Sequence, residues 1–182
     1  TLFKLVKNKD ARNSNLRRIL IVDLWLNTFY AVMIIYLPIF LHQHIGLSWS
    51  AIGIIFTWML LPFVLIEYPL GRLADNKWGE KEILATGLII TGFTTLIIPW
   101  LNLPHILAWS VLLFLTRVGA ASIEIMKETY LFKKIDGDDL DILSLSRASI
   151  PVSYLVAPLL ASVILIFLPI HFLFAFLGLG HV

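Results

Sequence analysis

Long uninterrupted runs of apolar residues, separated by short polar segments, dominate the pattern of this chain. A helix needs about 20 mostly apolar residues to cross a hydrocarbon core about 30 Å thick. Five runs are long enough, and a sixth begins near residue 170 and is cut at residue 182. The five are residues 19–41, 51–70, 83–100, 105–132 and 140–168. The pattern predicts an all-α membrane protein with six transmembrane helices, the last of them truncated, and its short connections predict antiparallel neighbours.

Composition favours the same class. The chain is 59% hydrophobic and 14% charged, with a mean hydropathy of +0.88, whereas soluble domains are about 45–50% apolar and about 25% charged. We therefore expect the lipid bilayer as its surroundings. The absence of Cys excludes disulfide and thiolate chemistry, and the formal charge of +2 does not favour nucleic acid as a partner.

Lys and Arg alternate between the ends of the predicted spans. Six of the fourteen precede residue 19, and three more flank the second connection, whereas residues 42–50, 101–104 and 168–170 contain none. Because cytoplasmic loops are enriched in these residues, the N-terminus should be cytoplasmic, in a plasma (inner) membrane. Residues 1–18 form a basic leader, either an amphipathic surface helix or a solvated linker, and residues 19–182 form the six-span domain.

Trp and His side chains near the span ends give weaker evidence about the orientation and function of the chain. Trp49, Trp100 and Trp109 should lie at the outer boundary and Trp78 at the inner one, as an interfacial belt. None of the five His has metal-ligand spacing with a carboxylate on the same face, so we predict no metal and no cofactor.

Charged residues inside the apolar runs are the candidate functional groups, because charges in lipid usually face a bundle interior or a wet cavity. For most of them a structural or gating role is favoured over contact with a solute. These supporting charges are Asp23, Glu67, Lys127, Glu128 and, in the fifth run, Arg147.

The fourth run carries the deepest charge. Arg117 lies about 18 Å from the outer end of its span, near the midplane, and shares a helical face with Glu124 and Glu128. These two carboxylates need cations, and Lys127 and Arg147 are the candidates. For Arg117, contact with a solute and a structural role both stay open. Arg117, Glu124 and Tyr154 form the candidate substrate or coupling path, with Glu124 as a possible proton carrier.

Small residues recur every fourth position in the fifth run, at Ser149, Ser153, Ala157 and Ala161. Such a stripe lets two helix backbones approach closely in a membrane. We predict that it is a packing face.

The charged segment at residues 71–84, GRLADNKWGEKEIL, joins the second and third runs. Its Gly-x-Leu-Ala-Asp, followed by basic residues and a Gly, resembles the cytoplasmic loop signature of the major facilitator superfamily of transporters. That family has two six-helix halves, each built from inverted three-helix repeats. The resemblance departs at two points: Asp75 and Gly79 are four residues apart rather than three, and Glu80 replaces an expected basic residue.

The resemblance implies roles for individual residues. Gly71 would permit close helix approach, and Asp75 would latch the cytoplasmic side near the N-terminus of the fifth span, where a carboxylate is stabilised. Gly79, Lys81 and Arg147 would belong to the same gate. The chain would be one half of a 12-helix carrier, and the basic leader favours the C-terminal half.

The function predicted from these features is secondary active transport of a small solute by alternating access, coupled to a proton or ion gradient or facilitated without one. No nucleotide-binding loop is present, and we do not expect an enzyme. Two alternatives stay open. A non-transporting scaffold or sensor is one. A membrane-embedded enzyme is the other, because an acidic cluster that could bind a divalent metal lies at Asp136, Asp138, Asp139 and Asp141.

Overall fold

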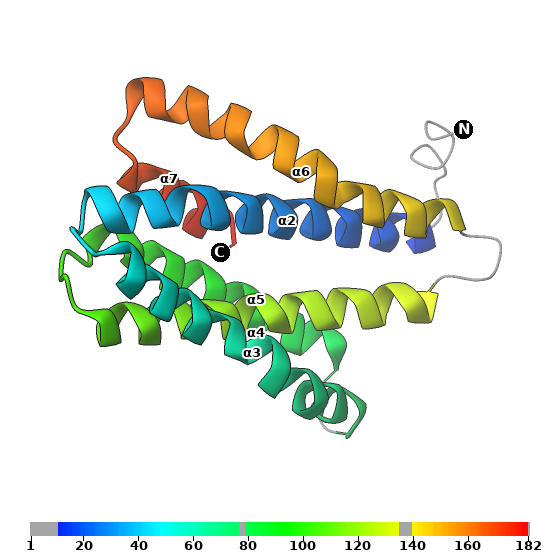
Figure 1. The fold of residues 1–182 in the computed structure, drawn as a ribbon. Coiled ribbons are helices and arrows are strands. Elements are labelled where there is room, and N and C mark those ends of the chain that lie inside the picture. Colours follow the sequence, from blue (N-terminus) through cyan, green and yellow to red (C-terminus); the bar gives the residue numbers. More distant parts are fainter. Residues whose placement is uncertain (1–10, 77–78, 135–139, 182) are drawn as a thin grey trace.

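The computed structural model describes residues 11–76, 79–134 and 140–181 of the 182-residue chain. These residues form a bundle of helices, and no strand occurs among them (Figure 1). Five of the helices are long and apolar enough to cross a membrane, which confirms the predicted all-α membrane class. The helices are α2 (Ala11–Gln43), α3 (Trp49–Asn76), α4 (Glu80–Ile97), α5 (Ile106–Lys134), α6 (Leu140–Phe167) and α7 (His171–Leu179), with a 3-10 turn η1 (Ile98–Trp100) after α4.

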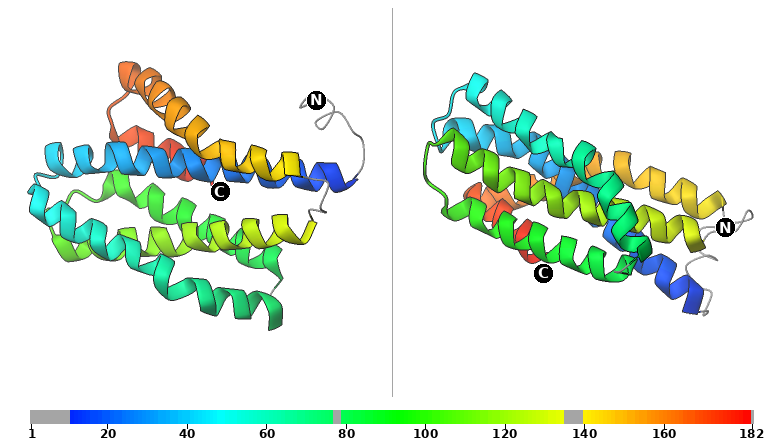
Figure 2. Two further views of the ribbon diagram at one scale, coloured as in Figure 1. Left: turned by 45° about the vertical axis from the view of Figure 1, so that its right-hand side comes forward. Right: turned by 90° about the horizontal axis from the view of Figure 1, so that it is seen from below.

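Three of the helix pairs form a pattern that is unchanged when the first three helices are exchanged with the last three. The extensive packing of α4 on α5 has no comparable counterpart between α7 and α2 among the described residues. Helix α6 packs along α2, and α3 packs along α5, while α7 packs against α4 (Figures 1 and 2). The exchange maps the α2–α6 pair onto the α5–α3 pair and leaves the α4–α7 pair in place. Pairing of this kind is expected of two inverted three-helix repeats.

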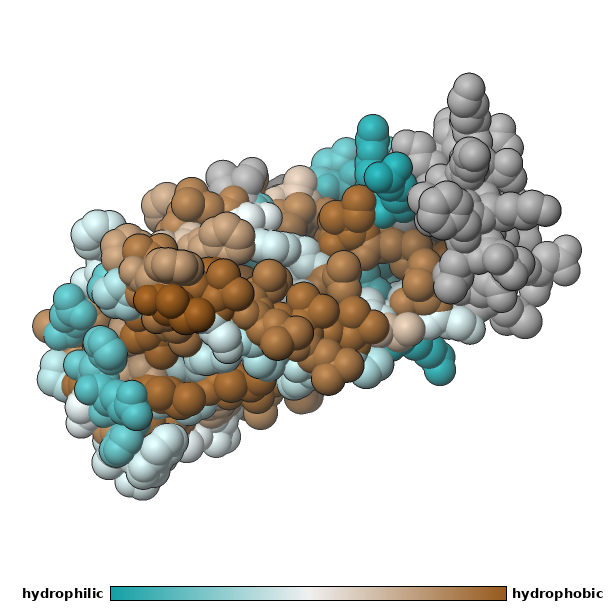
Figure 3. Space-filling view, turned by 90° about the horizontal axis from the view of Figure 1, so that it is seen from above, coloured by the Kyte–Doolittle hydropathy of each residue, from teal (hydrophilic) through white to brown (hydrophobic). Residues whose placement is uncertain are grey.

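The core is apolar and so is much of the surface. Phe29, Phe40, Trp109 and Phe174 are among the largest fully buried side chains. Figure 3 shows apolar residues across the middle of the visible face and hydrophilic residues toward both ends. A soluble protein rarely exposes so wide an apolar area, so the middle of the bundle is the part that contacts lipid.

Helices α4 and α5 cross at two glycines. A Cβ built on Gly119 would lie 2.7 Å from the backbone nitrogen of Thr91 and 2.8 Å from the carbonyl oxygen of Gly87. Glycine alone lets the two backbones approach this closely. The close approach predicted at Gly71 is not found among the described residues, because a Cβ there would meet no atom within 4 Å.

The connection between the second and third spans is shorter than the charged segment predicts. Helix α3 continues to Asn76 and α4 begins at Glu80, so only residues 77–79 separate them. The first helix begins earlier than predicted, because α2 already includes residues 11–18 of the basic leader. Residues 1–10 lie outside the description.

The predicted tryptophan belt holds only in part. Trp49 and Trp100 are exposed, but Trp109 is fully buried and its indole Nε1 donates a hydrogen bond to the Leu103 carbonyl at 2.8 Å. Trp109 therefore anchors the connection between α4 and α5 from inside the bundle, near the end of its span where it was predicted, but it does not face the lipid. Trp78 lies outside the described residues.

The stripe of small residues on α6 is confirmed as a packing face. Ser149, Ser153, Ala157 and Ala161 are all buried. Ser153 donates a hydrogen bond to the Leu24 carbonyl of α2 at 3.2 Å, so the stripe faces α2.

Candidate functional site

A buried carboxylate on α2 gathers polar groups from three helices. Lys127 of α5 donates to Oδ1 of Asp23 and forms an ion pair with it, and Asn27 donates to the same oxygen at 2.9 Å. Oδ2 accepts a hydrogen bond from Ser146 of α6 at 2.6 Å and lies 2.9 Å from the Ser149 hydroxyl. We refer to these five residues as the Asp23 cluster.

Both oxygens of the Asp23 carboxylate are hydrogen-bonded within the Asp23 cluster, and these bonds link α2, α5 and α6. Asn27 also donates to the Ser149 oxygen at 2.7 Å, which adds a second link between α2 and α6. Charge-assisted hydrogen bonds of this kind are about twice as strong as neutral ones. Removing one partner of such a buried pair would leave an uncompensated charge in the bundle.

A second cluster surrounds Arg117 of α5, which is only 8% exposed. Its guanidinium carbon lies 4.3 Å from the centre of the Tyr30 ring and 4.6 Å from that of Phe63, so rings from α2 and α3 hold it by cation–π contact. The Tyr30 hydroxyl donates a hydrogen bond to Oε2 of Glu124 at 2.9 Å. We call Arg117, Tyr30, Phe63 and Glu124 the Arg117 cluster.

The Arg117 cluster holds opposite charges without a contact ion pair. Glu124 attracts Arg117 through space, but no carboxylate among the described residues lies within 4 Å of the guanidinium. The Arg117 Nε atom is buried and has no hydrogen-bond partner in the described part of the chain. Arg117 therefore keeps unused donor capacity inside the bundle and, unlike Lys127, has no contact with a carboxylate among the described residues.

The predicted partners of Glu124 are corrected by this geometry. Lys127 pairs with Asp23 instead, and Arg147 is exposed and makes no ion pair with any described residue. The partner of Glu124 is Tyr30, which the sequence analysis missed. A signal was present, since Asp23, Asn27 and Tyr30 have the i, i+4, i+7 spacing of one helical face.

The third residue of the predicted path, Tyr154, and the supporting charge Glu128 lie nearer the surface. Tyr154 is exposed on α6, close enough to interact electrostatically with Arg117 but without a hydrogen bond to it. Glu128 is exposed on α5. The structure therefore brings Arg117 and Glu124 together, with Tyr154 at the edge of the group.

The charged connection is only partly described. Gly79 precedes α4, Lys81 is exposed, and Glu80 accepts a hydrogen bond from Lys133 of α5 at 2.5 Å. Glu80, which departs from the loop signature, is thus paired with a residue of α5. The side chains of Glu67 and Asp75 lie outside the described set, as do residues 135–139 and the side chain of Asp141.

Membrane-crossing helices in an inverted pairing pattern, with charged clusters buried between them, define the class of helical membrane transport proteins. Within this class, the family model for the Major Facilitator Superfamily matches residues 24–181, and the chain belongs to that family. The resemblance drawn from residues 71–84 is thereby confirmed. No curated protein and no solved structure gave a match. The chain is accordingly an integral membrane protein of a transporter family.

Proposed function

We propose that this chain is one six-helix half of a 12-helix carrier that moves a small solute by alternating access. Membership of the family and the inverted pairing of its helices support this proposal, because such carriers work by rocking one repeat or bundle against another around a central site. The basic leader favours the C-terminal half.

The observation that carries the proposal is the state of Arg117. A guanidinium that is 8% exposed, held by two rings and without a contact ion pair to any described residue, is costly within a membrane. Ionisable groups in such places commonly mark solute or ion paths. We assign Arg117, Glu124 and Tyr154 to the solute or coupling path, with Tyr30 as the residue that holds Glu124. Glu124 is the candidate proton carrier if transport is coupled to a proton gradient.

The Asp23 cluster has a supporting role in this proposal. Its two opposite charges are already paired, and the Asp23 carboxylate is hydrogen-bonded at both oxygens. The cluster fixes α2, α5 and α6 relative to one another while other contacts change.

The gate is assigned to the charged connection and its surroundings. Gly71, Asp75, Gly79, Lys81 and Arg147 form the proposed latch at the inner end. We expect Asp75→Ala to slow switching between states more than it weakens solute affinity. Cysteine accessibility at the inner end, measured beside solute binding, tests this, and an unchanged accessibility pattern with unchanged transport would remove Asp75 from the latch.

The test of transport uses the full-length parent protein in proteoliposomes. Uptake and efflux are screened over a solute panel, with and without an imposed proton gradient, for the wild type and for Arg117→Ala. Leu159→Ala is the matched control, because Leu159 is 68% exposed on α6 and belongs to neither cluster.

Each outcome of the screen has a meaning. Gradient-dependent flux of one solute, lost in Arg117→Ala and kept in Leu159→Ala, supports a coupled carrier with Arg117 in its path. Flux without gradient dependence indicates a facilitator. No flux despite verified insertion would contradict transport and favour a scaffold or sensor, and a metal-dependent chemical change in a solute would favour an enzyme.

A further inference from the structure

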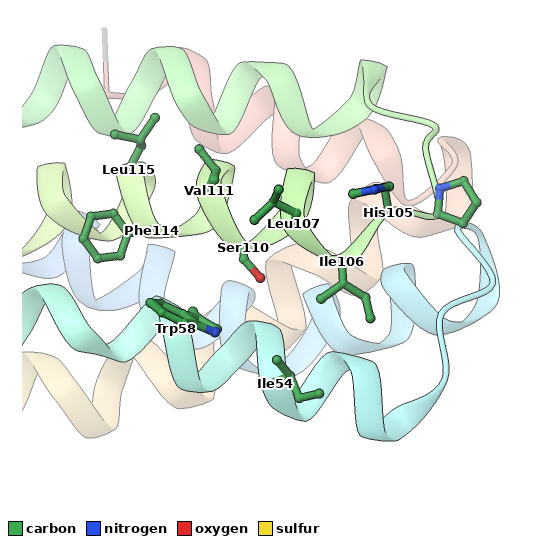
Figure 4. A pocket seen from close by; sticks show the side chains of 10 residues that line it. Ile54, Trp58, His105, Ile106, Leu107, Ser110, Val111, Phe114 and Leu115 are labelled. Atoms are coloured by element: carbon green, nitrogen blue, oxygen red, sulfur yellow. The ribbon is translucent and has the colours of Figure 1, made fainter.

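An open apolar groove runs between α3 and α5 at the end of the bundle where α4 is connected to α5. Its volume is about 770 Å³. Figure 4 shows Ile54 and Trp58 of α3 facing α5 across it. Leu107 and Val111 of α5 are 65% and 52% exposed there. Neither charged cluster contributes a residue to the groove.

One hydroxyl in this groove differs from the others on the same helix. Thr116, Ser122 and Thr129 each donate a hydrogen bond to the carbonyl four residues before them, at 2.8–2.9 Å. Ser110 is only 8% exposed, yet its hydroxyl has no partner among the described residues, and it points into the groove (Figure 4). Because this hydroxyl is open to the groove and donates to no described residue, a ligand that offers an acceptor can take its hydrogen bond.

Two more polar groups lie in the same groove. The indole Nε1 of Trp58 has no described partner, whereas those of Trp25 and Trp109 donate at 3.1 and 2.8 Å. The imidazole of His105 is exposed just before the start of α5, where the groove reaches the end of the bundle. The groove is therefore polar toward its end and apolar along its length toward Leu115.

We propose that this groove binds one glycerophospholipid of the surrounding bilayer. The phosphate lies beside His105, an ester carbonyl accepts hydrogen bonds from Ser110 and Trp58, and an acyl chain follows α5 past Val111 to Leu115. That stretch of α5, from residue 106 to residue 115, is about 13 Å long. The volume falls within the range of about 300–1,000 Å³ that is usual for small-molecule sites with apolar walls and few polar groups.

The polar groups favour a lipid over a covering protein helix. A helix satisfies its backbone groups internally, so an apolar helix laid on the groove would leave the donors of Ser110 and Trp58 unmet. A phospholipid carries its acceptors at one end and its apolar chain behind them, in the same order as the groove. The proposal holds whatever solute the carrier moves, and so it can fail or succeed separately from the proposed transport.

The first test counts phospholipid that stays bound to the full-length parent protein after detergent purification, by native mass spectrometry. Val111→Trp fills the groove, and we expect the bound fraction to fall at least tenfold. Leu159→Trp, on the exposed side of α6, is the size-matched control and should retain lipid as the wild type does. Ser110→Ala leaves the shape intact and should weaken retention about two- to tenfold, as expected for one lost hydrogen bond.

A second measurement locates the bound lipid. Phospholipid brominated on its acyl chain should quench the fluorescence of Trp58. The contribution of Trp58 is the part of the quenching that is lost in Trp58→Phe. Val111→Trp is left out of this measurement because it adds a fluorophore. Equal lipid retention by Val111→Trp and the wild type would overturn the site, even if Trp58 is quenched, and would indicate ordinary exchange of boundary lipid. A Trp58 that brominated lipid does not quench would also overturn it and would indicate that protein covers the groove.

Discussion

The two charged clusters of this helix bundle contain similar groups but are built differently. In the Asp23 cluster, a cation and an anion meet directly, and hydroxyl and amide groups from two helices fill the remaining positions. In the Arg117 cluster, Tyr30 separates the charges: its ring contacts Arg117 and its hydroxyl binds Glu124.

The difference shows how one bundle combines fixed and responsive charges. A matched ion pair costs energy to break, so it holds helices in place. A guanidinium held by ring faces keeps donors that a solute or another helix can engage. We interpret the first arrangement as structural and the second as the part that takes part in transport.

The largest loss of stability should follow from breaking the ion pair between Asp23 and Lys127. Lys127→Met leaves the Asp23 carboxylate buried without its cation and should lower the free energy of unfolding by about 3–5 kcal/mol. Thermal unfolding of the full-length parent in detergent measures this. Adding Asp23→Asn to Lys127→Met should restore most of the loss, because it removes the unpaired charge; a double variant as unstable as the single one would argue against the pair as the cause.

Removing the unmatched cation should affect transport more than folding. Arg117→Ala should reduce flux at least a hundredfold, equivalent to about 2.7 kcal/mol, while the protein still inserts, because Glu124 keeps its bond from Tyr30. Flux per inserted protein, normalised to Leu159→Ala, measures the effect. Full transport by Arg117→Ala would remove Arg117 from the path.

Tyr30 makes two contacts that can be removed separately: its ring packs on Arg117, and its hydroxyl donates to Glu124. Tyr30→Phe keeps the ring against Arg117 but removes the donor to Glu124, and should cost about 1.5 kcal/mol, as expected for a hydrogen bond to a charged group. Chemical denaturation beside flux measurement checks both consequences. Tyr30→Leu, which also removes the ring, should cost more; equal costs for the two variants would mean that the ring contact contributes nothing.

The smallest effect is expected within the matched cluster. Ser149→Ala removes one acceptor of Asn27 and one hydroxyl beside Asp23, but Lys127 and Ser146 stay in place. The loss should be about 1 kcal/mol, visible as a small shift of the unfolding midpoint with unchanged flux. A strong loss of flux at near-normal stability would give this cluster a transport role after all.

The sequence predicted what depends on periodicity. Runs of apolar residues identified the spans, and the four-residue repeat from Ser149 to Ala161 identified the face that packs on α2. Residues 71–84 were enough to indicate the family. Each of these signals lies within one segment, so it could be read without knowing which helices are neighbours.

Contacts between distant segments could not be predicted in the same way. Asp23 and Lys127 are 104 positions apart, and Tyr30 and Glu124 are 94 apart. Within α5, Lys127 is an equally good partner for Glu124 by spacing alone; only the packing of α2 against α5 assigns it to Asp23. The burial of Trp109 was not predicted for the same reason, because burial depends on the neighbouring helices.

The most direct measurement compares solute flux per inserted protein for Arg117→Ala and for the Asp23→Asn/Lys127→Met double variant, both in the full-length parent. If the Asp23 cluster is structural and the Arg117 cluster lies in the path, the double variant transports near the wild-type rate and Arg117→Ala does not. Loss of flux in a folded double variant, with normal flux in Arg117→Ala, would reverse the two assignments.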